Sequence, residues 1–152
     1  MKITTVYFSA TYTTHRIVSH LAKRLSEEVI ECDITNDTPT KEIVIPKEEV
    51  LVVGIPAYAG RVPEMAVERI RRFKGEGTPA IAVAVYGNRD YDDALLELSD
   101  LLSDNGFQVI SAGAFIAQHS IFPKVGAHRP DAEDYHQINV FADESNKILN
   151  KH

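Results

Sequence analysis

The sequence predicts an α/β fold, in which a doubly wound five-stranded parallel sheet lies between two layers of helices. Three observations lead to this prediction. Apolar runs of strand length alternate with segments whose apolar residues repeat at helical spacing. The runs 50–55 and 80–85 are apolar without interruption, as in strands that are buried on both faces. Long connections separate these runs, as parallel pairing requires, and the expected strand order is 2-1-3-4-5.

The first half of the chain is expected to supply three strands. Residues 2–8 form the first strand, and the apolar spacing that follows predicts a helix over about 14–28. A short second strand covers 29–33. The polar stretch 35–46 contains two prolines and is expected to be a loop. The apolar run 50–55 is then the third strand, at the centre of the sheet.

A second helix is expected to begin at Pro63, because a proline's missing N–H is not needed at the first helical position. Its apolar face consists of Ala66, Val67, Ile70 and Phe73. Its basic residues are expected to form a solvated face, together with the lysine that follows: Arg69, Arg71, Arg72 and Lys74. A turn over 75–79 then leads to the fourth strand, 80–85.

The last part of the chain is expected to add two helices and the fifth strand. Asp90, Asp92 and Asp93 place negative charge at the start of the third helix, where it complements the helix dipole. Gly106 is the expected C-cap of that helix. The fifth strand follows over 107–116, with Gly113 inside it as a candidate bulge. After a long loop, 117–130, Asp131 is placed to cap a last helix.

Composition narrows the class of protein. The chain has 152 residues, 44% apolar and 25% charged, which fits one globular domain over 1–152. No apolar run approaches the roughly 18–20 residues of a membrane span, and no signal peptide is evident, so we expect a cytoplasmic protein without a membrane partner. The formal net charge of −6 argues against nucleic-acid binding. Cys32 is the single cysteine, which excludes disulfides within the chain. We expect Cys32 to be a small buried apolar residue.

Open sheets of this class bind ligands beyond the carboxyl ends of their strands, where the strand order reverses. Glycines, aromatic residues and side-chain amides are concentrated at these ends, in the segments 56–60, 86–91 and 118–120. The first strand ends in a hydroxyl-rich run, 9–14, directly before a helix. Free backbone N–H groups and the helix dipole make such a place suitable for a phosphate. The alternative is a hydroxyl-rich helix cap without a ligand.

Three motifs resemble those of the flavodoxins, in particular the flavodoxin domains that are sometimes fused to an iron–sulfur ferredoxin module. The segment 9–14 matches the family's phosphate loop, Ser-Gly-Thr-Gly-Asn-Thr, at Ser9, Thr11 and Thr14. Ala10 and Tyr12 stand where the family usually has glycine. The other two motifs are 56–63 and 86–95, and the resemblance extends over essentially the whole chain.

The resemblance implies an FMN-binding protein that transfers low-potential electrons between separate redox partners, either ferredoxin-like proteins or reductases. Tyr58 and Tyr91 are the candidates to stack on the flavin ring, and Gly60 or the Ala59 carbonyl is the candidate contact to flavin N5. Gly87 and Asn88 are candidates for the pyrimidine edge. The full set of expected cofactor-binding residues is Ser9, Ala10, Thr11, Tyr12, Thr13, Thr14, Pro56, Ala57, Tyr58, Ala59, Gly60, Tyr86, Gly87, Asn88, Tyr91 and Asp92.

This sequence lacks the residues that other classes of protein with a related topology require. A phosphoryl receiver needs acidic residues where Ser9 and Ala10 stand and an aspartate where Pro56 stands. A dinucleotide-binding domain needs G-x-G-x-x-G, and a serine hydrolase needs G-x-S-x-G. The spacing of His128, Asp131, Asp134 and His136 matches no metal-ligand pattern, so no metal site is expected. No catalytic residue is expected either, because the flavin itself would carry out the chemistry.

Three functions stay open from the sequence. The first is a single-electron carrier, which the small size, the acidic surface and the absence of a nicotinamide motif favour. The second is an FMN-dependent reductase that takes hydride from NAD(P)H and reduces a quinone-type acceptor, with the loop 117–130 enclosing a substrate. The third is a module of the same fold that has lost its flavin, since Ala10 and Tyr12 depart from the phosphate-loop pattern.

Overall fold

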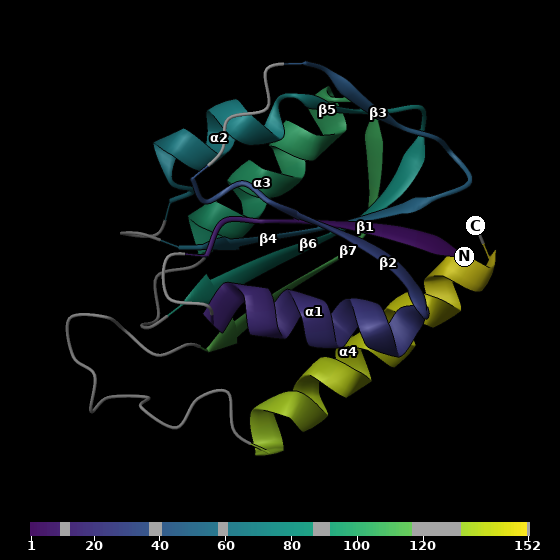
Figure 1. Cartoon of the computed structure of the whole chain (residues 1–152). Helices are drawn as coiled ribbons and strands as arrows, with labels where there is room; N and C mark the ends of the chain where they lie inside the picture. Colours follow the sequence, from purple (N-terminus) through teal and green to yellow (C-terminus); the bar gives the residue numbers. More distant parts are fainter. Residues whose placement is uncertain (10–12, 37–40, 58–60, 87–91, 117–131, 152) are drawn as a thin grey trace.

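The computed structural model describes residues 1–9, 13–36, 41–57, 61–86, 92–116 and 132–151. Five strands form one parallel sheet in the order β2-β1-β4-β6-β7, which confirms the predicted doubly wound order 2-1-3-4-5 (Figure 1). The strands of this sheet are β1 (Lys2–Tyr7), β2 (Glu28–Asp33), β4 (Val50–Pro56), β6 (Thr78–Tyr86) and β7 (Phe107–Ile116).

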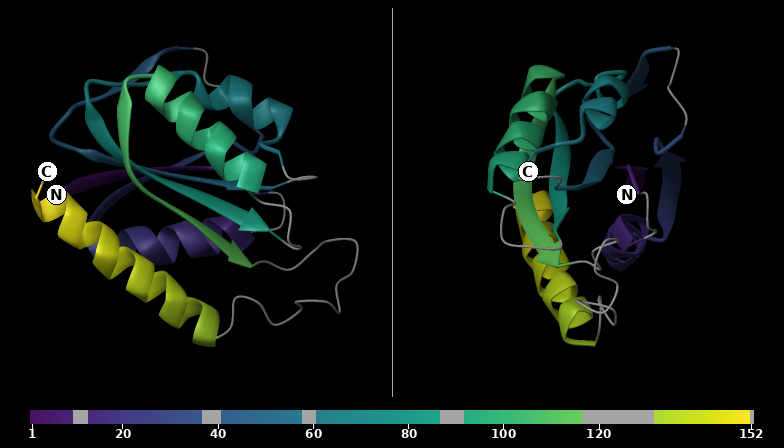
Figure 2. Two further views of the ribbon diagram at one scale, coloured as in Figure 1. Left: turned by 180° about the vertical axis from the view of Figure 1, so that it is seen from behind. Right: turned by 90° about the vertical axis from the view of Figure 1, so that its left-hand side faces the viewer.

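Helices cover both faces of this sheet, as Figure 2 shows from two further directions. One face carries α1 (Thr13–Leu25) and α4 (Ala132–Lys151), and the other carries α2 (Glu64–Ile70) and α3 (Asp92–Asp104). None of these helices, within the residues that are described, is both long and apolar enough to cross a bilayer.

The central strand β4 is buried on both faces, as its uninterrupted apolar sequence predicts. Leu51, Val53 and Ile55 pack with the apolar residues of α2 and α3. Val50 and Val52 alternate with them and pack with α1 and α4 on the opposite face. The alternation of a strand's side chains therefore divides the core into two clusters, one under each helix layer.

A second, two-stranded sheet corrects the prediction of a loop over 35–46 and of Phe73 on the second helix. β3 (Ile43–Ile45) pairs in parallel with β5 (Phe73–Gly75), and Phe73 is fully buried. Three-residue strands are too short to show a periodic pattern, and their stability comes from pairing between distant segments. Thr78, at the start of β6, anchors the small sheet by donating its hydroxyl to the Ile45 carbonyl at 2.6 Å.

Two helix boundaries differ from the prediction. α1 ends at Leu25 instead of Glu28, and β2 already begins at Glu28, whose N–H donates to the Ser26 hydroxyl at 3.1 Å. Pro63 is the N-cap of α2 and not its first helical residue, since its ψ of 133° is extended. The Pro63 carbonyl accepts the N–H groups of Ala66 and Val67, so the proline still begins the helix.

Three single-residue expectations have different outcomes. Gly106 has φ of +92° two residues after the end of α3, as expected of the glycine that ends a helix. The irregularity in β7 lies at Ile110, where the register against β6 shifts, and not at Gly113. Gly113 is needed because an added Cβ would lie 2.9 Å from the Phe141 ring. Cys32 is only half-buried, and burial raises the pKa of its thiol.

Candidate functional site

The carboxyl ends of β1 and β4 mark the point where the connections of the sheet diverge. β1 leads to α1 on one face, and β4 leads to α2 on the other (Figure 1). The sheet's hydrogen bonds continue past both strand ends, from the Phe8 N–H to the Gly54 carbonyl at 3.1 Å and from the Ala57 N–H to the Val85 carbonyl at 2.9 Å. Ligands of such sheets bind at this divergence, so the edge is the candidate site.

Ser9 follows β1 at this edge and is held through both its backbone and its side chain. The Ser9 N–H donates to Thr35 Oγ1 at 2.8 Å, and Ser9 Oγ accepts the His15 N–H at 3.1 Å. Because Ser9 Oγ is the acceptor in that contact, its own hydroxyl hydrogen can be donated to another group. Ser9 thus caps the first turn of α1 from six residues upstream and keeps one donor for a ligand.

Thr13 and Thr14 are the first residues of α1, and both are buried. Their helix is seated close to the sheet, since a Cβ added to Gly54 of β4 would lie 2.2 Å from Val18 Cγ2 and 3.1 Å from Thr14 Cγ2. The first turn of α1 contains no acidic residue. Hydroxyls and first-turn N–H groups therefore meet at a helix end whose dipole favours an anion.

Arg69 corrects the expected solvated basic face. Its guanidinium is buried, donates from Nη1 to the Ile34 carbonyl at 2.8 Å and the Thr35 carbonyl at 2.6 Å, and lies 5.9 Å from the centre of the Phe8 ring. Since Thr35 accepts the Ser9 N–H, Arg69 supports the candidate site through one intervening residue. The sequence shows only a run of basic residues, and the partner carbonyls lie 34 and 35 positions away.

The segment after β4 is tied to α3 by a two-point ion pair. Arg61 donates from Nε to Glu97 Oε1 at 3.3 Å and from Nη2 to Glu97 Oε2 at 2.7 Å. The Val62 N–H also donates to Glu97 Oε1, at 2.9 Å. The hydrogen bond from Arg61 holds the pKa of Glu97 below its usual value, and the Val62 N–H acts in the same direction. The second predicted motif is therefore anchored at its C-terminal end.

The structure brings part of the predicted cofactor site together at one edge of the sheet. Ser9, Thr13 and Thr14 lie at the β1–α1 junction, Pro56 and Ala57 at the end of β4, and Tyr86 and Asp92 at the end of β6 and the start of α3. The other predicted site residues lie outside the described residues: Ala10, Thr11, Tyr12, Tyr58, Ala59, Gly60, Gly87, Asn88 and Tyr91.

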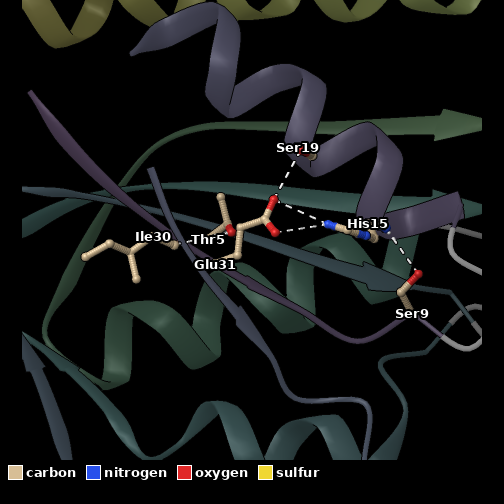
Figure 3. A network of polar contacts seen from close by, with 6 residues as sticks. All are labelled: Thr5, Ser9, His15, Ser19, Ile30 and Glu31. Atoms are coloured by element: carbon tan, nitrogen blue, oxygen red, sulfur yellow. Dashed lines mark hydrogen bonds and ion pairs between the residues drawn. The ribbon is translucent and has the colours of Figure 1, made fainter. Parts of the chain in front are cut away.

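His15 and Glu31 form a polar contact beside this edge that the sequence analysis did not identify (Figure 3). The Glu31 carboxylate lies 3.3 Å from His15 Nε2 through both of its oxygens and accepts the Ser19 hydroxyl at 3.2 Å. The only available signals were that His15 directly follows the hydroxyl-rich run and that Glu31 lies on the strand expected beside β1.

A groove between α2 and α3 lies away from this edge. Its volume is about 420 Å³, and its lining includes Val67, Leu101 and the Arg61–Glu97 pair. This groove follows the helix layer and does not include the ends of β1 and β4, so we do not place the site there. No group of three or more metal-ligating side chains occurs in the part of the chain that the structure describes.

Comparison with known proteins defines the fold class. The chain matches no protein-family model, and no curated protein matches it by sequence. Solved structures do match over nearly the whole chain. Oxidised flavodoxin 2 from Bacillus cereus has a TM-score of 0.71 at 15% identity, with 97% of this chain and 99% of that chain covered.

Two further structures support the same class. The Fusobacterium nucleatum flavodoxin bound to flavin mononucleotide has a TM-score of 0.65 at 15% identity, covering 96% of this chain and 97% of that one. A flavodoxin from the domain Archaea has a TM-score of 0.61 at 16% identity, with both chains covered completely. The fold is therefore flavodoxin-like, in agreement with the resemblance seen in the sequence.

Proposed function

We propose that this chain binds FMN at the carboxyl edge of its sheet and carries single electrons between redox proteins. The observation that carries the proposal is the junction of β1 and α1, where Ser9, Thr13 and Thr14 accompany the N-terminal turn of a helix seated on the central strand. The flavodoxin-like fold supports the proposal, because one of the structurally similar flavodoxins was solved with FMN bound.

The described residues fit the phosphate end of FMN. Ser9 keeps a hydroxyl donor, the first turn of α1 has N–H groups without helical acceptors, and that turn has no carboxylate to repel an anion. We further propose that Tyr58 and Tyr91 pack on the flavin ring and exclude water from it. The bound flavin supplies the redox chemistry, and the protein's residues hold and orient it.

The charge of the chain supports transfer to protein partners. The net charge is −6, and Asp93, next to the first residue of α3, is exposed at the proposed flavin edge. A negative surface of this kind guides the approach of a positively charged partner, for which we propose a separate ferredoxin-like protein or reductase. We place this exchange in the cytoplasm, where the Cys32 thiol stays reduced.

Absorption spectroscopy during a reductive titration tests the proposal. The purified protein is mixed with FMN, freed of excess flavin and reduced stepwise without oxygen. A single-electron carrier retains one FMN per chain and is reduced in two separate one-electron steps. Reduction in a single two-electron step by NAD(P)H would identify a reductase instead. A protein that retains no flavin would contradict both functions.

A further inference from the structure

The His15 side chain is fixed from two sides. Its ring stacks on the Tyr7 ring of β1, with centroids 4.4 Å apart and planes inclined by 13°. Its Nε2 lies 3.3 Å from both carboxylate oxygens of Glu31 on β2 (Figure 3). An imidazole that faces an ionised carboxylate in this way carries a proton on Nε2, so the ring donates to Glu31.

Glu31 is itself held in place by α1. The Ser19 hydroxyl, one turn after His15, donates to Glu31 Oε1 at 3.2 Å. The carboxylate therefore connects the edge strand β2 to two residues, one turn apart, on one side of the helix. Since β2 pairs in register with β1, with Thr5 opposite Glu31, this contact fixes the start of α1 relative to the strand that leads to Ser9.

The backbone of His15 contacts the proposed phosphate site directly. Its N–H is one of the first-turn donors without a helical acceptor, and it donates to Ser9 Oγ at 3.1 Å. This contact sets the direction in which the Ser9 hydroxyl can donate. The Tyr7 stack and the Glu31 contact therefore hold the residue whose amide orients Ser9.

We propose that His15, clamped by Tyr7 and Glu31, is a positioning residue that gives the site its preference for phosphorylated over unphosphorylated flavin. This inference rests on the proposed function. It adds that the preference depends on side chains at the outer edge of the sheet as well as on the hydroxyl-rich loop. The clamp acts through geometry, because it holds Ser9 where the hydroxyl reaches a phosphate oxygen.

The direction in which a change at Glu31 alters FMN affinity distinguishes a positioning role from a simple effect of charge. Glu31 carries a negative charge on the strand beside β1, so by Coulomb's law alone its removal would favour the binding of an anion such as FMN. A positioning role requires the opposite result. Glu31→Ala is therefore expected to weaken FMN binding, whereas Glu31→Gln retains an oxygen that accepts the His15 Nε2–H and is expected to stay close to wild type.

The experiment measures the dissociation constants of FMN and riboflavin for the whole chain, since the two ligands differ only by the phosphate. We expect His15→Ala and Glu31→Ala to lower the FMN-to-riboflavin preference about fivefold, or about 1 kcal/mol, with riboflavin affinity unchanged. His20→Ala is the matched control: His20 lies on the same helix but contacts Asn139 Oδ1 at 2.7 Å on α4, so its loss leaves the preference unchanged.

Each of the other possible outcomes contradicts either the positioning role of His15 or the proposed function. If wild-type protein prefers FMN and both alanine variants keep that preference, or bind FMN more tightly, the positioning role is wrong and the proposed function stands. Equal weakening of both flavins would also overturn it, because the phosphate would not be involved. If wild-type protein binds neither flavin, the proposed function is wrong, and this inference fails with it.

Discussion

Gly54 permits α1 to approach the central strand more closely than any larger residue would. An added Cβ would lie 2.2 Å from Val18 Cγ2, well inside the distance at which carbon atoms repel. This glycine has no positive φ that would require it, so its role is one of space alone. The position of the α1 N-terminus, and with it the proposed phosphate site, therefore depends on a missing side chain in the sheet.

Gly54→Ala is expected to lower the free energy of unfolding by about 2 kcal/mol, as overpacking of a closed core does. Chemical denaturation measures this change. Val18→Ala serves as the partner variant, because it removes the atom that the new Cβ would meet. The double variant should then lose less stability than the sum of the two single changes. Strict additivity would show that the close approach at Gly54 does not limit the packing of α1.

At the scale of elements, hydrogen bonds made by the side chain of one element hold the end of another element in place. Glu97 of α3 accepts hydrogen bonds from the Arg61 side chain and the Val62 backbone, and so holds the connection between β4 and α2. Thr78 has the same kind of role for the small sheet, because its hydroxyl donates to the Ile45 carbonyl and accepts the Glu76 N–H. The Arg61–Glu97 and Thr78–Ile45 contacts each join segments that lie more than 30 positions apart.

The Arg61–Glu97 pair is expected to contribute stability that depends on pH. Because the folded-state pKa of Glu97 lies below its usual 4.5, the contribution is complete above that value and disappears as the pH falls through the lowered pKa. Glu97→Gln should therefore cost up to about 1 kcal/mol at pH 7, since the pair is partly exposed, and the difference should close in acid.

Denaturation at a series of pH values checks this expectation. Glu68→Gln is the control, because Glu68 forms an exposed i,i+3 pair with Arg71 at 3.5 Å, and its loss should change stability by less than about 0.5 kcal/mol. A difference between wild type and Glu97→Gln that stays constant from pH 7 to acid would contradict the charged contact.

Thr78→Val tests the anchoring of the small sheet. Thr78 is fully buried, and valine has the same shape without the hydroxyl. The Ile45 carbonyl would lose its donor and the Glu76 N–H its acceptor, so we expect a loss of about 1–3 kcal/mol in the free energy of unfolding. Hydrogen exchange should show faster exchange of the β3 and β5 amides. Unchanged stability and exchange would mean that the hydroxyl does not hold this sheet.

At the scale of the whole molecule, a ligand that binds only the folded chain must stabilise it. FMN at about one hundred times its dissociation constant should add about 2.7 kcal/mol, which for a chain of this size raises the melting temperature by roughly 5–10 °C. Riboflavin at the same concentration should add less, because it lacks the phosphate. A melting temperature that is insensitive to both flavins would oppose FMN binding.

The main sheet could be predicted because each of its strands carries a local signal. The apolar runs at β4 and β6 indicate strands buried on both faces. The helical spacing from Ile17 onward predicts α1 in the stretch of sequence between β1 and β2. The small sheet could not be predicted, since β3 and β5 are three residues each and are paired only through the fold. The observed helix ends differ from the predicted ones by one to three residues, because capping contacts made in the folded chain decide where a helix ends.

The sequence by itself determined which strand ends carry hydroxyls, and hence that Ser9, Thr13 and Thr14 lie at the divergence of the sheet. Only the tertiary structure showed that Arg69 is buried beneath this edge and that His15 is clamped between Tyr7 and Glu31. The physical reason is the range of the interactions. Hydrophobic periodicity is local and visible along the chain, whereas these hydrogen bonds and ring contacts join elements that become neighbours only when the sheet forms.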